Sequence, residues 1–175
     1  MTTISWAGAR TGGIKTTLLF LTLVVAASAQ AQPQFDVVAP FNAAAPDGAR
    51  PAAGLVEART NPGTFYGTTS SGGDFGFGTV FKLVNAGGTS TLKTIHSFNN
   101  TDGASPVAAL VESATNAGVF YGTTQQGGDN GAGAIFELDA TTTNETVTRI
   151  QQFDWGSAWY PSAALVEART SPGTF

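Results

Sequence analysis

A 55-residue tandem repeat constrains this chain more than any other feature of its sequence. Residues 47–101 and 102–156 align without a gap and are identical at 26 of 55 positions. A partial third copy, 157–175, matches the first copy at 10 of 12 positions over residues 164–175. Tandem copies of one small unit stack to bury a shared core, so the sequence predicts a row of similar units. Because the third copy stops inside a predicted strand, we expect the chain to be a truncated piece of a longer repeat protein.

Each copy contains four stretches typical of β-strands, separated by turn-forming residues. In the first copy these stretches are 51–58, 64–70, 79–84 and 91–98. A glycine-rich loop at 72–78 and the Gly87-Gly88 pair supply two of the turns. Four short strands per repeat are typical of a β-propeller blade, so we predict an all-β fold of blade-like, four-stranded antiparallel sheets that is incomplete. A β-solenoid is the alternative, although a 55-residue period is long for its coils.

The residue types also assign a place to each predicted strand. The inner strands of a blade are covered on both faces by neighbouring blades, which suits the small and apolar residues of the first three stretches. The fourth stretch is more polar, so we predict that it forms an outer edge protected against aggregation. Its polar residues are Lys93, His96 and Ser97 in the first copy and Thr148, Arg149 and Gln151 in the second.

The N-terminus has the pattern of a signal peptide at residues 1–31, followed by a lead-in segment at 32–46. Arg10 and Lys15 precede an apolar run, 18–27, and small residues suited to cleavage follow it. The run is too short to cross a bilayer as a stable helix, so we expect no transmembrane segment after cleavage. The protein is therefore predicted to be secreted or exposed at the cell surface.

Charge and composition exclude several classes of function. The formal charge of −4 becomes −6 when residues 1–31, which carry two basic residues and no acidic ones, are removed, so nucleic acid is not an expected partner. The chain has no cysteine and one histidine, which argues against a zinc site and against a histidine-based catalytic triad. The absence of cysteine in an exported protein also favours a bacterial source.

The repeated motifs follow one another in a fixed order. In the first copy they are 55–57 (L-V-E), 65–69 (F-Y-G-T-T), 72–78 (G-G-D-F-G-F-G) and 80–83 (V-F-K-L), and D-G-A at 102–104 opens the next copy. This order resembles the GloVer-type tandem repeats of secreted bacterial proteins over about 36–175. The resemblance implies export, often with a C-terminal surface anchor, and it supplies no established activity or catalytic residue. The copies differ where Thr79 becomes Ala134 and Lys82 becomes Glu137.

Repeated acidic residues are the first candidates for a site. Asp74 and its equivalent Asp129 lie in the glycine-rich loops, which superficially resemble calcium-binding turns, but one carboxylate per 55 residues is too few for calcium. We predict a structural turn in which the aspartate binds local amides. Glu57, Glu112 and Glu167 could line a shared channel; the alternative places each at a strand end, in solvent or paired with an arginine such as Arg59 or Arg169.

The remaining candidates are turn aspartates, one histidine and aromatic residues. Asp47 and Asp102 precede glycine in predicted turns, and His96 is expected at the surface. Recurring aromatic residues are predicted to form packing layers: Phe65, Tyr66, Phe120, Tyr121 and Phe175. The unrepeated Trp155, Trp159 and Tyr160 could stack on a sugar, contact a protein or fill the junction between copies.

These features predict a secreted or cell-surface repeat protein with a structural or binding role and no catalytic activity. No catalytic, cofactor-binding or metal-binding residue is predicted, and the ligand is unknown. The partner classes that stay open are a polysaccharide or protein at the cell surface and self-association through open sheet edges. The alternative is a carbohydrate-active enzyme or a carbohydrate-binding adhesin on a propeller scaffold.

Overall fold

The computed structural model describes residues 37–41, 46–156, 158–168 and 175. All of them belong to one compact unit, Asp36–Phe175. The signal peptide predicted at residues 1–31 lies outside the described residues, as does most of the lead-in segment. No helix long and apolar enough to cross a membrane occurs in the described part of the chain.

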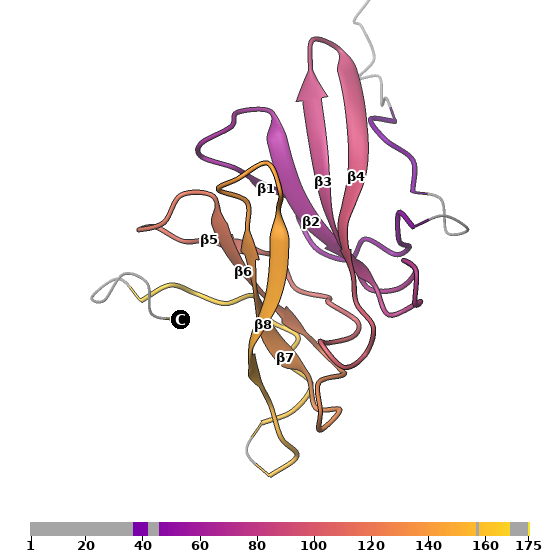
Figure 1. Cartoon of the computed structure of the whole chain (residues 1–175), viewed down its shortest axis with the longest axis vertical. Coiled ribbons are helices and arrows are strands. Elements are labelled where there is room, and N and C mark those ends of the chain that lie inside the picture. The colour runs from indigo at the N-terminus through magenta and orange to yellow at the C-terminus, as the bar shows by residue number, and fades with distance from the viewer. Residues whose placement is uncertain (1–36, 42–45, 157, 169–174) are drawn as a thin grey trace, which may run out of the picture. The chain divides into compact units, whose positions relative to one another are not determined.

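The described residues form two four-stranded antiparallel sheets and contain no helix (Figure 1). The strands of the first sheet are β1 (Val56–Glu57), β2 (Thr64–Thr69), β3 (Thr79–Ala86) and β4 (Thr89–Ser97). The strands of the second sheet are β5 (Val111–Glu112), β6 (Val119–Thr124), β7 (Ala134–Asp139) and β8 (Thr146–Gln152). In each sheet consecutive strands are neighbours. The predicted all-β class with four antiparallel strands in each complete copy is confirmed.

The first strand of each sheet is much shorter than predicted. β1 has two residues, whereas the apolar stretch that predicted it runs over 51–58. Arg50 adopts a left-handed backbone conformation (φ 58°), and Pro51 follows it without an amide hydrogen to donate. The two residues turn the chain out of the ladder, so pairing with β2 resumes only at Val56. The other three strands lie within two residues of their predicted bounds at each end.

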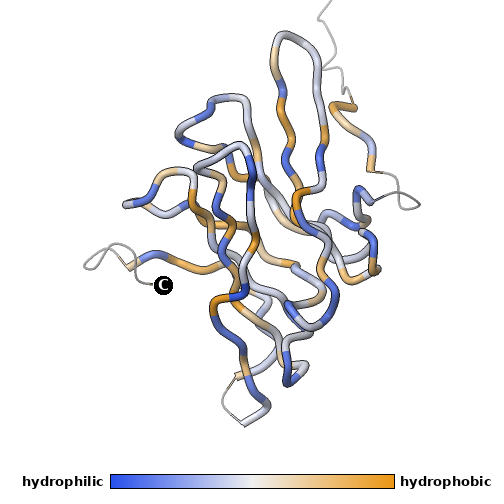
Figure 2. The backbone as a smooth tube through the Cα atoms, viewed as in Figure 1, coloured by the Kyte–Doolittle hydropathy of each residue, from blue (hydrophilic) through white to orange (hydrophobic). Residues whose placement is uncertain are grey.

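Each sheet has two faces with different residues, because side chains alternate along a strand. Face A of the first sheet carries Tyr66, Thr68 and Val80, and its face B carries Phe65, Phe81 and Leu83, as the strand register shows. The equivalent residues, 55 positions later, define faces A and B of the second sheet. Figure 2 shows hydrophobic and hydrophilic residues alternating along the β3–β4 hairpin.

Face A of the first sheet packs against face B of the second sheet to form the core. The rings of Tyr66 and Phe120 lie 4.7 Å apart, and those of Phe98 and Phe136 lie 5.2 Å apart. The buried residues of this cluster are Ala58, Tyr66, Val80 and Phe98 from the first copy and Leu110, Phe120, Phe136 and Leu138 from the second. The core therefore lies between the two copies, and neither sheet encloses a core of its own.

β4 and β8 form outer edges, as predicted for the fourth strands. Each pairs with one neighbour only, and exposed and half-buried side chains alternate along most of each strand. Such polar, alternating edges resist pairing with a strand from another molecule.

Candidate functional site

The Tyr-Gly-Thr-Thr motif joins one copy to the next through its first and third residues. Tyr66 contacts the ring of Phe120, and the hydroxyl of Thr68 donates a long hydrogen bond of 3.5 Å to the carbonyl of Ala108. Both partners belong to the second copy. These two side chains therefore contribute to the interface between the sheets.

The second and fourth residues of the motif act within one sheet. A Cβ atom on Gly67 would lie 2.6 Å from the Phe81 ring and 2.8 Å from Leu55, so a larger residue would force these side chains to shift. The hydroxyl of Thr69 accepts a hydrogen bond of 3.2 Å from the Thr79 amide. It also lies 2.8 Å from the Thr79 hydroxyl. All four motif residues thus have structural partners, which explains the motif without a chemical role.

The same contacts recur 55 residues later, between the second copy and the partial third copy. The rings of Tyr121 and Phe175 lie 4.3 Å apart, and the Thr123 hydroxyl lies 3.5 Å from the Ala163 carbonyl. A backbone bond between successive copies also recurs, from Ser105 N to Phe77 O at 2.8 Å and from Tyr160 N to Ala132 O at 3.1 Å. Successive copies therefore stack head to tail through one repeated geometry.

Glu112 fastens the two copies together at the end of the sheets that carries the β1–β2 loop. Its Oε1 accepts the Gly118 amide at 2.8 Å, which closes the β5–β6 loop. Its Oε2 accepts both the backbone amide and the Nε of Arg59, each at 3.1 Å. The Arg59 guanidinium also donates to the carbonyls of Ser113 and Ala114. The Glu112 side chain is only 7% exposed, so its carboxylate is committed to these bonds.

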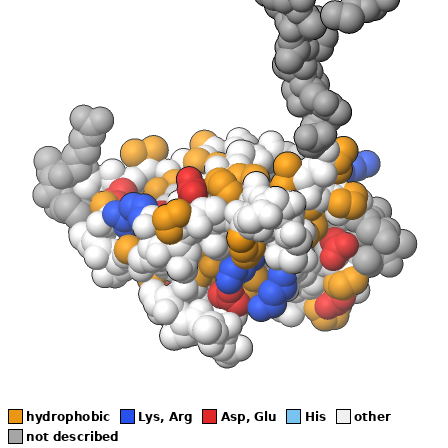
Figure 3. Space-filling model, turned by 90° about the horizontal axis from the view of Figure 1, so that it is seen from above, with side chains coloured by type: hydrophobic (Ala, Val, Ile, Leu, Met, Phe, Trp, Pro, Cys, Tyr) orange, Lys and Arg blue, Asp and Glu red, His pale blue; other side chains and the backbone are white. Residues whose placement is uncertain are grey.

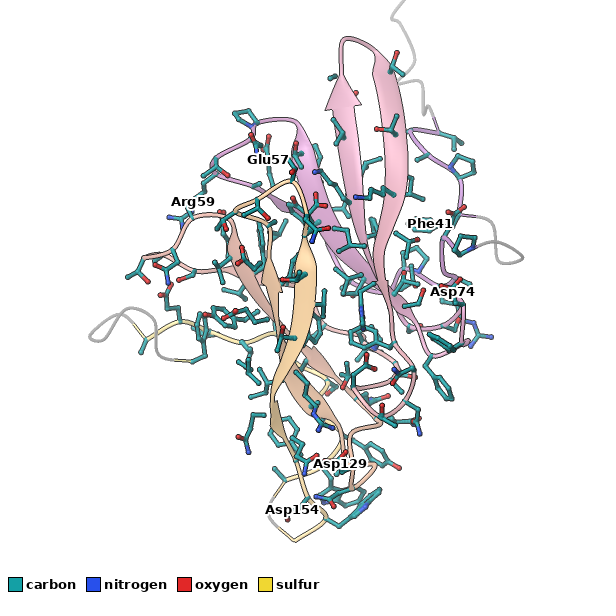
Figure 4. All side chains as sticks on the ribbon, in the orientation of Figure 1. Phe41, Glu57, Arg59, Asp74, Asp129 and Asp154 are labelled. Atoms are coloured by element: carbon teal, nitrogen blue, oxygen red, sulfur yellow. The ribbon has the colours of Figure 1, made fainter. Side chains whose placement is uncertain are left out.

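The other two glutamates follow the same plan. Glu57 accepts the amide of Gly63 at 2.8 Å and so closes the β1–β2 loop, as Glu112 closes the equivalent loop. Glu167 accepts a hydrogen bond from the backbone amide of Ala114 at 2.7 Å. This bond is equivalent, one copy later, to the bond from the backbone amide of Arg59 to Glu112. Figure 4 shows Glu57 and Arg59 on the loop side of the first sheet. The expected pairing of a glutamate with an arginine thus occurs across the copies, while Arg169 lies outside the described residues.

The glycine-rich loops are structural turns, as predicted. Gly72, Gly73, Gly76 and Gly78 all have positive φ angles, and so do their four equivalents in the second copy. The expectation that the loop aspartate binds local amides is wrong for Asp129, whose two oxygens each lie 3.1 Å from the guanidinium of Arg149. Among the described residues, no group of three or more acidic or histidine side chains is placed to hold a metal ion.

Asp102 caps a turn and holds the single histidine. Its Oδ1 accepts the amide of Asn99 at 2.9 Å, and its Oδ2 lies 2.8 Å from Nε2 of His96. His96 also packs edge-on against Phe98. The expected turn role of Asp102 is confirmed, and Asp47 likewise lies in a turn. His96 is half-buried and paired instead of lying freely at the surface.

A charged cluster across the two sheets has no counterpart in the sequence prediction. Glu145, in the hairpin before β8, lies 2.5 Å from Nζ of Lys82 and 3.2 Å from Nζ of Lys93. Burial opposes ionisation of Glu145, but the hydrogen bonds from the two lysines outweigh it and lower its pKa. The bond to Glu145 raises the pKa of Lys82. Burial raises the pKa of Tyr66, whose ring centroid lies 6.0 Å from the same ammonium.

The sequence feature that could have indicated this cluster is a change of charged residues between the two copies. Lys82 is replaced by Glu137 and Ser90 by Glu145 in the second copy, so charges of opposite sign appear in successive units. Such a change matters when the units touch, because a charge on one copy then needs a partner on the next. Figure 3 shows basic and acidic side chains next to each other among the hydrophobic ones.

The unrepeated aromatic residues form one exposed cluster at the opposite end of the second sheet. The rings of Trp155, Trp159 and Tyr160 lie 5.2 to 5.5 Å from one another, and all three are exposed. Nε1 of Trp155 donates to the Asn130 carbonyl at 2.5 Å, which fixes that ring. Figure 4 places Asp129 and Asp154 at this same end.

The first junction between copies also carries exposed aromatic rings, but on the other loop. There Phe75 and Phe77 in the glycine-rich loop lie at the positions of Asn130 and Ala132, and Ser105 lies at the position of Tyr160. At each junction one loop therefore supplies large rings and the other supplies small residues. This exchange favours a junction-filling role for the rings and leaves their outer faces accessible.

Comparison with known proteins places most of the chain in one sequence family. The family described as the Gloeobacter/Verrucomicrobia repeat matches residues 23–175. No curated protein and no solved structure matches the chain.

Proposed function

The chain belongs to the Gloeobacter/Verrucomicrobia repeat family, which confirms the predicted resemblance, and we propose that it is a secreted or cell-surface repeat protein with a structural or binding role. Its sheets are blades of a β-propeller, and it has no catalytic activity. The proposal covers location, architecture and role together, and each has its own support in the sequence or in the contacts between copies.

The repeated interface is the observation that supports a stack of similar copies, and the four antiparallel strands in each complete copy favour the blades of a propeller. The contact of Tyr66 with Phe120 and that of Tyr121 with Phe175 are the same contact moved by one copy. An interface that joins different faces of identical units is heterologous, and it either closes into a ring or continues as an open stack. Closure gives a propeller, and continuation gives a solenoid-like stack.

The structural use of the repeated polar residues supports a role without catalysis. Thr69 binds within its own sheet, Asp102 caps a turn, and Glu112 links two loops. A catalytic group must be free to contact a substrate, and these side chains are already satisfied by the fold. The surface that such a protein presents is then suited to binding or to spacing other parts of an assembly.

The experiment that tests location and architecture uses two readouts. A bacterial host that produces the chain is fractionated, and the intact mass of the exported product is measured by mass spectrometry. We expect the mass of a mature protein that lacks residues 1–31. Chains extended with further copies of residues 102–156 are then viewed by electron microscopy, and closed rings at one copy number are expected. Rods that lengthen with every added copy would overturn the propeller, and a cytoplasmic chain of full mass would overturn export.

Carbohydrate binding is the second candidate function, and the exposed cluster of Trp155, Trp159 and Tyr160 is the observation that favours it. Aromatic rings exposed on a loop can stack on the apolar faces of sugars. The chain has three tryptophans, and Trp6 lies in the predicted signal peptide, so tryptophan fluorescence of the mature protein reports on this cluster alone.

Titration with soluble polysaccharides tests the second candidate. We expect a saturable fluorescence change that the Trp159→Ala variant loses and that the Phe75→Ala variant, altered at the other junction, retains. An unchanged spectrum across a panel of neutral and acidic polysaccharides would count against this candidate.

A further inference from the structure

Face B of the first sheet is open where face B of the second sheet is covered. Leu55 is 48% exposed, whereas its equivalent Leu110 is 2% exposed. Phe65 is half-buried, whereas its equivalent Phe120 is fully buried. The open face forms an apolar groove of about 370 Å³, whose lining includes Leu55, Phe81, Leu83 and Leu92. Leu55, Phe65, Phe81 and Leu83 have identical residues at the equivalent positions of the second sheet, so the difference in exposure arises because a preceding sheet covers face B of the second sheet.

Face A shows the opposite difference. Tyr66, Val80 and Phe98 on the first sheet are buried beneath the second sheet. Their equivalents on the second sheet, Tyr121, Ile135 and Phe153, are only half-buried. Ile150 is 50% exposed, whereas its equivalent Ile95 packs against the core. The chain therefore presents an incompletely covered face B on its first sheet and an incompletely covered face A on its second sheet.

The lead-in segment covers a small part of the open face B. The ring of Phe41 lies 4.9 Å from that of Phe81 at an interplanar angle of 74°. This contact imitates the one between Phe98 and Phe136, at 5.2 Å and 64°, in which the preceding sheet supplies the first ring. Phe41 thus takes the place of one side chain of a preceding sheet. The described part of the lead-in segment leaves Leu55 exposed, and Val37 and Val38, which also line the groove, are exposed themselves.

The partial third copy covers a small part of face A on the second sheet in the same manner. Phe175 and the backbone at Ala163 occupy the places that Phe120 and Ala108 occupy one copy earlier. Residues 164–175 differ from 54–65 at two of 12 positions, so the start of a first copy can make the same contacts. A complete first sheet would also bring the strands that cover Ile150.

The sheet edges do not offer an equally good surface for association. β1 and β5 contain two residues each, which is too few for a stable ladder. β4 and β8 are polar edges with alternating exposed side chains. The predicted association through open edges is therefore less favoured than association through the two faces.

We propose that face B of the first sheet binds face A of the second sheet in a second copy of this chain. The first sheet of one molecule displaces the partial third copy of the other and reproduces the interface already present within each chain. Phe41 leaves its place on Phe81 when this happens. Because the two faces differ, the association is heterologous and does not stop at a dimer unless a ring closes. The inference concerns contacts between chains and holds for a propeller and for a solenoid alike.

Sedimentation velocity on the purified exported chain, over a range of concentrations, tests this proposal. We expect a reversible series of species larger than a dimer as concentration rises, or one closed ring. Leu55→Asp disables face B and Ile150→Asp disables face A, because a carboxylate buried in an apolar contact weakens association by more than about tenfold. Phe75→Asp places the same charge on an exposed site outside both faces and serves as the control.

Mixing the two disabled variants gives the decisive result. Each variant alone is expected to stay monomeric, while an equimolar mixture forms a heterodimer and nothing larger, because each variant retains one working face. Phe41→Ala is expected to strengthen association of the otherwise unchanged chain by uncovering face B. A chain that stays monomeric at every concentration, or variants whose mixture fails to pair while circular dichroism shows both folded, would overturn the proposal.

Discussion

Replacing the equivalent residues Leu55 and Leu110 by alanine measures how much stability lies between the two copies. The substitution is chemically identical at the two positions. Each leucine also has the same neighbour, since a Cβ atom added to the glycine of the adjacent Tyr-Gly-Thr-Thr motif would lie 2.8 Å from the leucine side chain. The positions differ in that Leu110 lies between two sheets and Leu55 lies on an open face. The difference between the two costs therefore isolates the effect of the first sheet, which covers Leu110 and has no counterpart over Leu55.

The expected magnitudes follow from burial. Alanine lacks three of the carbon groups of leucine, and each contributes about 0.8 kcal/mol when fully buried, so transfer alone costs about 2.4 kcal/mol at Leu110. The space left behind raises the cost to roughly 3–5 kcal/mol, as for other buried leucines. Leu55 is 48% exposed and borders an open groove, so we expect about 1.2 kcal/mol there.

Urea unfolding followed by circular dichroism measures both costs, in dilute solution where the chain is monomeric. With a slope of about 1–3 kcal/mol per molar urea, a difference of roughly 2 kcal/mol or more between the variants separates their midpoints by about 1 M. Equal costs for the two variants would refute the reasoning, since they would mean that Leu55 is as well covered in solution as Leu110.

Three further predictions concern the bonds between and within the sheets. Glu112→Gln is expected to lower the free energy of unfolding by about 1–3 kcal/mol, because the NH2 group that replaces one carboxylate oxygen cannot accept a hydrogen bond and the ion pair with Arg59 of the preceding copy is lost. Glu57→Gln, which alters the local loop bond to Gly63, is expected to cost less, and urea midpoints compare the two variants. Gly122→Ala is expected to destabilise the protein more than Gly67→Ala, because the side chains that surround Gly67 can move into the open groove. Thermal unfolding compares the two variants, and the reverse order of stability would contradict the packing described above. Glu145 has a lowered pKa, so its contribution is fully present above about pH 4.3, the usual value for glutamate, and is lost as the pH falls through the lower value. The stability difference between the unchanged chain and Glu145→Gln should therefore shrink below about pH 4, and a difference that persists at pH 2 would contradict this account.

Much of the fold could be predicted from the sequence because the relevant signals are local. The 55-residue period, the turn glycines at 72–78 and the Gly87-Gly88 turn each act over a few residues. Strands β2, β3 and β4 follow from apolar and β-branched residues between such turns. The short β1 could not be predicted in the same way, because the turn at Arg50 and Pro51 keeps most of the stretch 51–58 out of the ladder.

By itself, the sequence determined the repeat, the all-β class, the polar outer strands and the family to which the chain belongs. Only the tertiary structure decided that face A of one copy packs on face B of the next, that Glu112 binds Arg59 in the preceding copy, and that Glu145 forms ion pairs with two lysines. The reason is physical. Turn and strand preferences depend on neighbours in the chain, whereas these contacts depend on how one sheet is rotated and placed against the next. That placement results from packing the whole apolar faces, and no local pattern of residues specifies it.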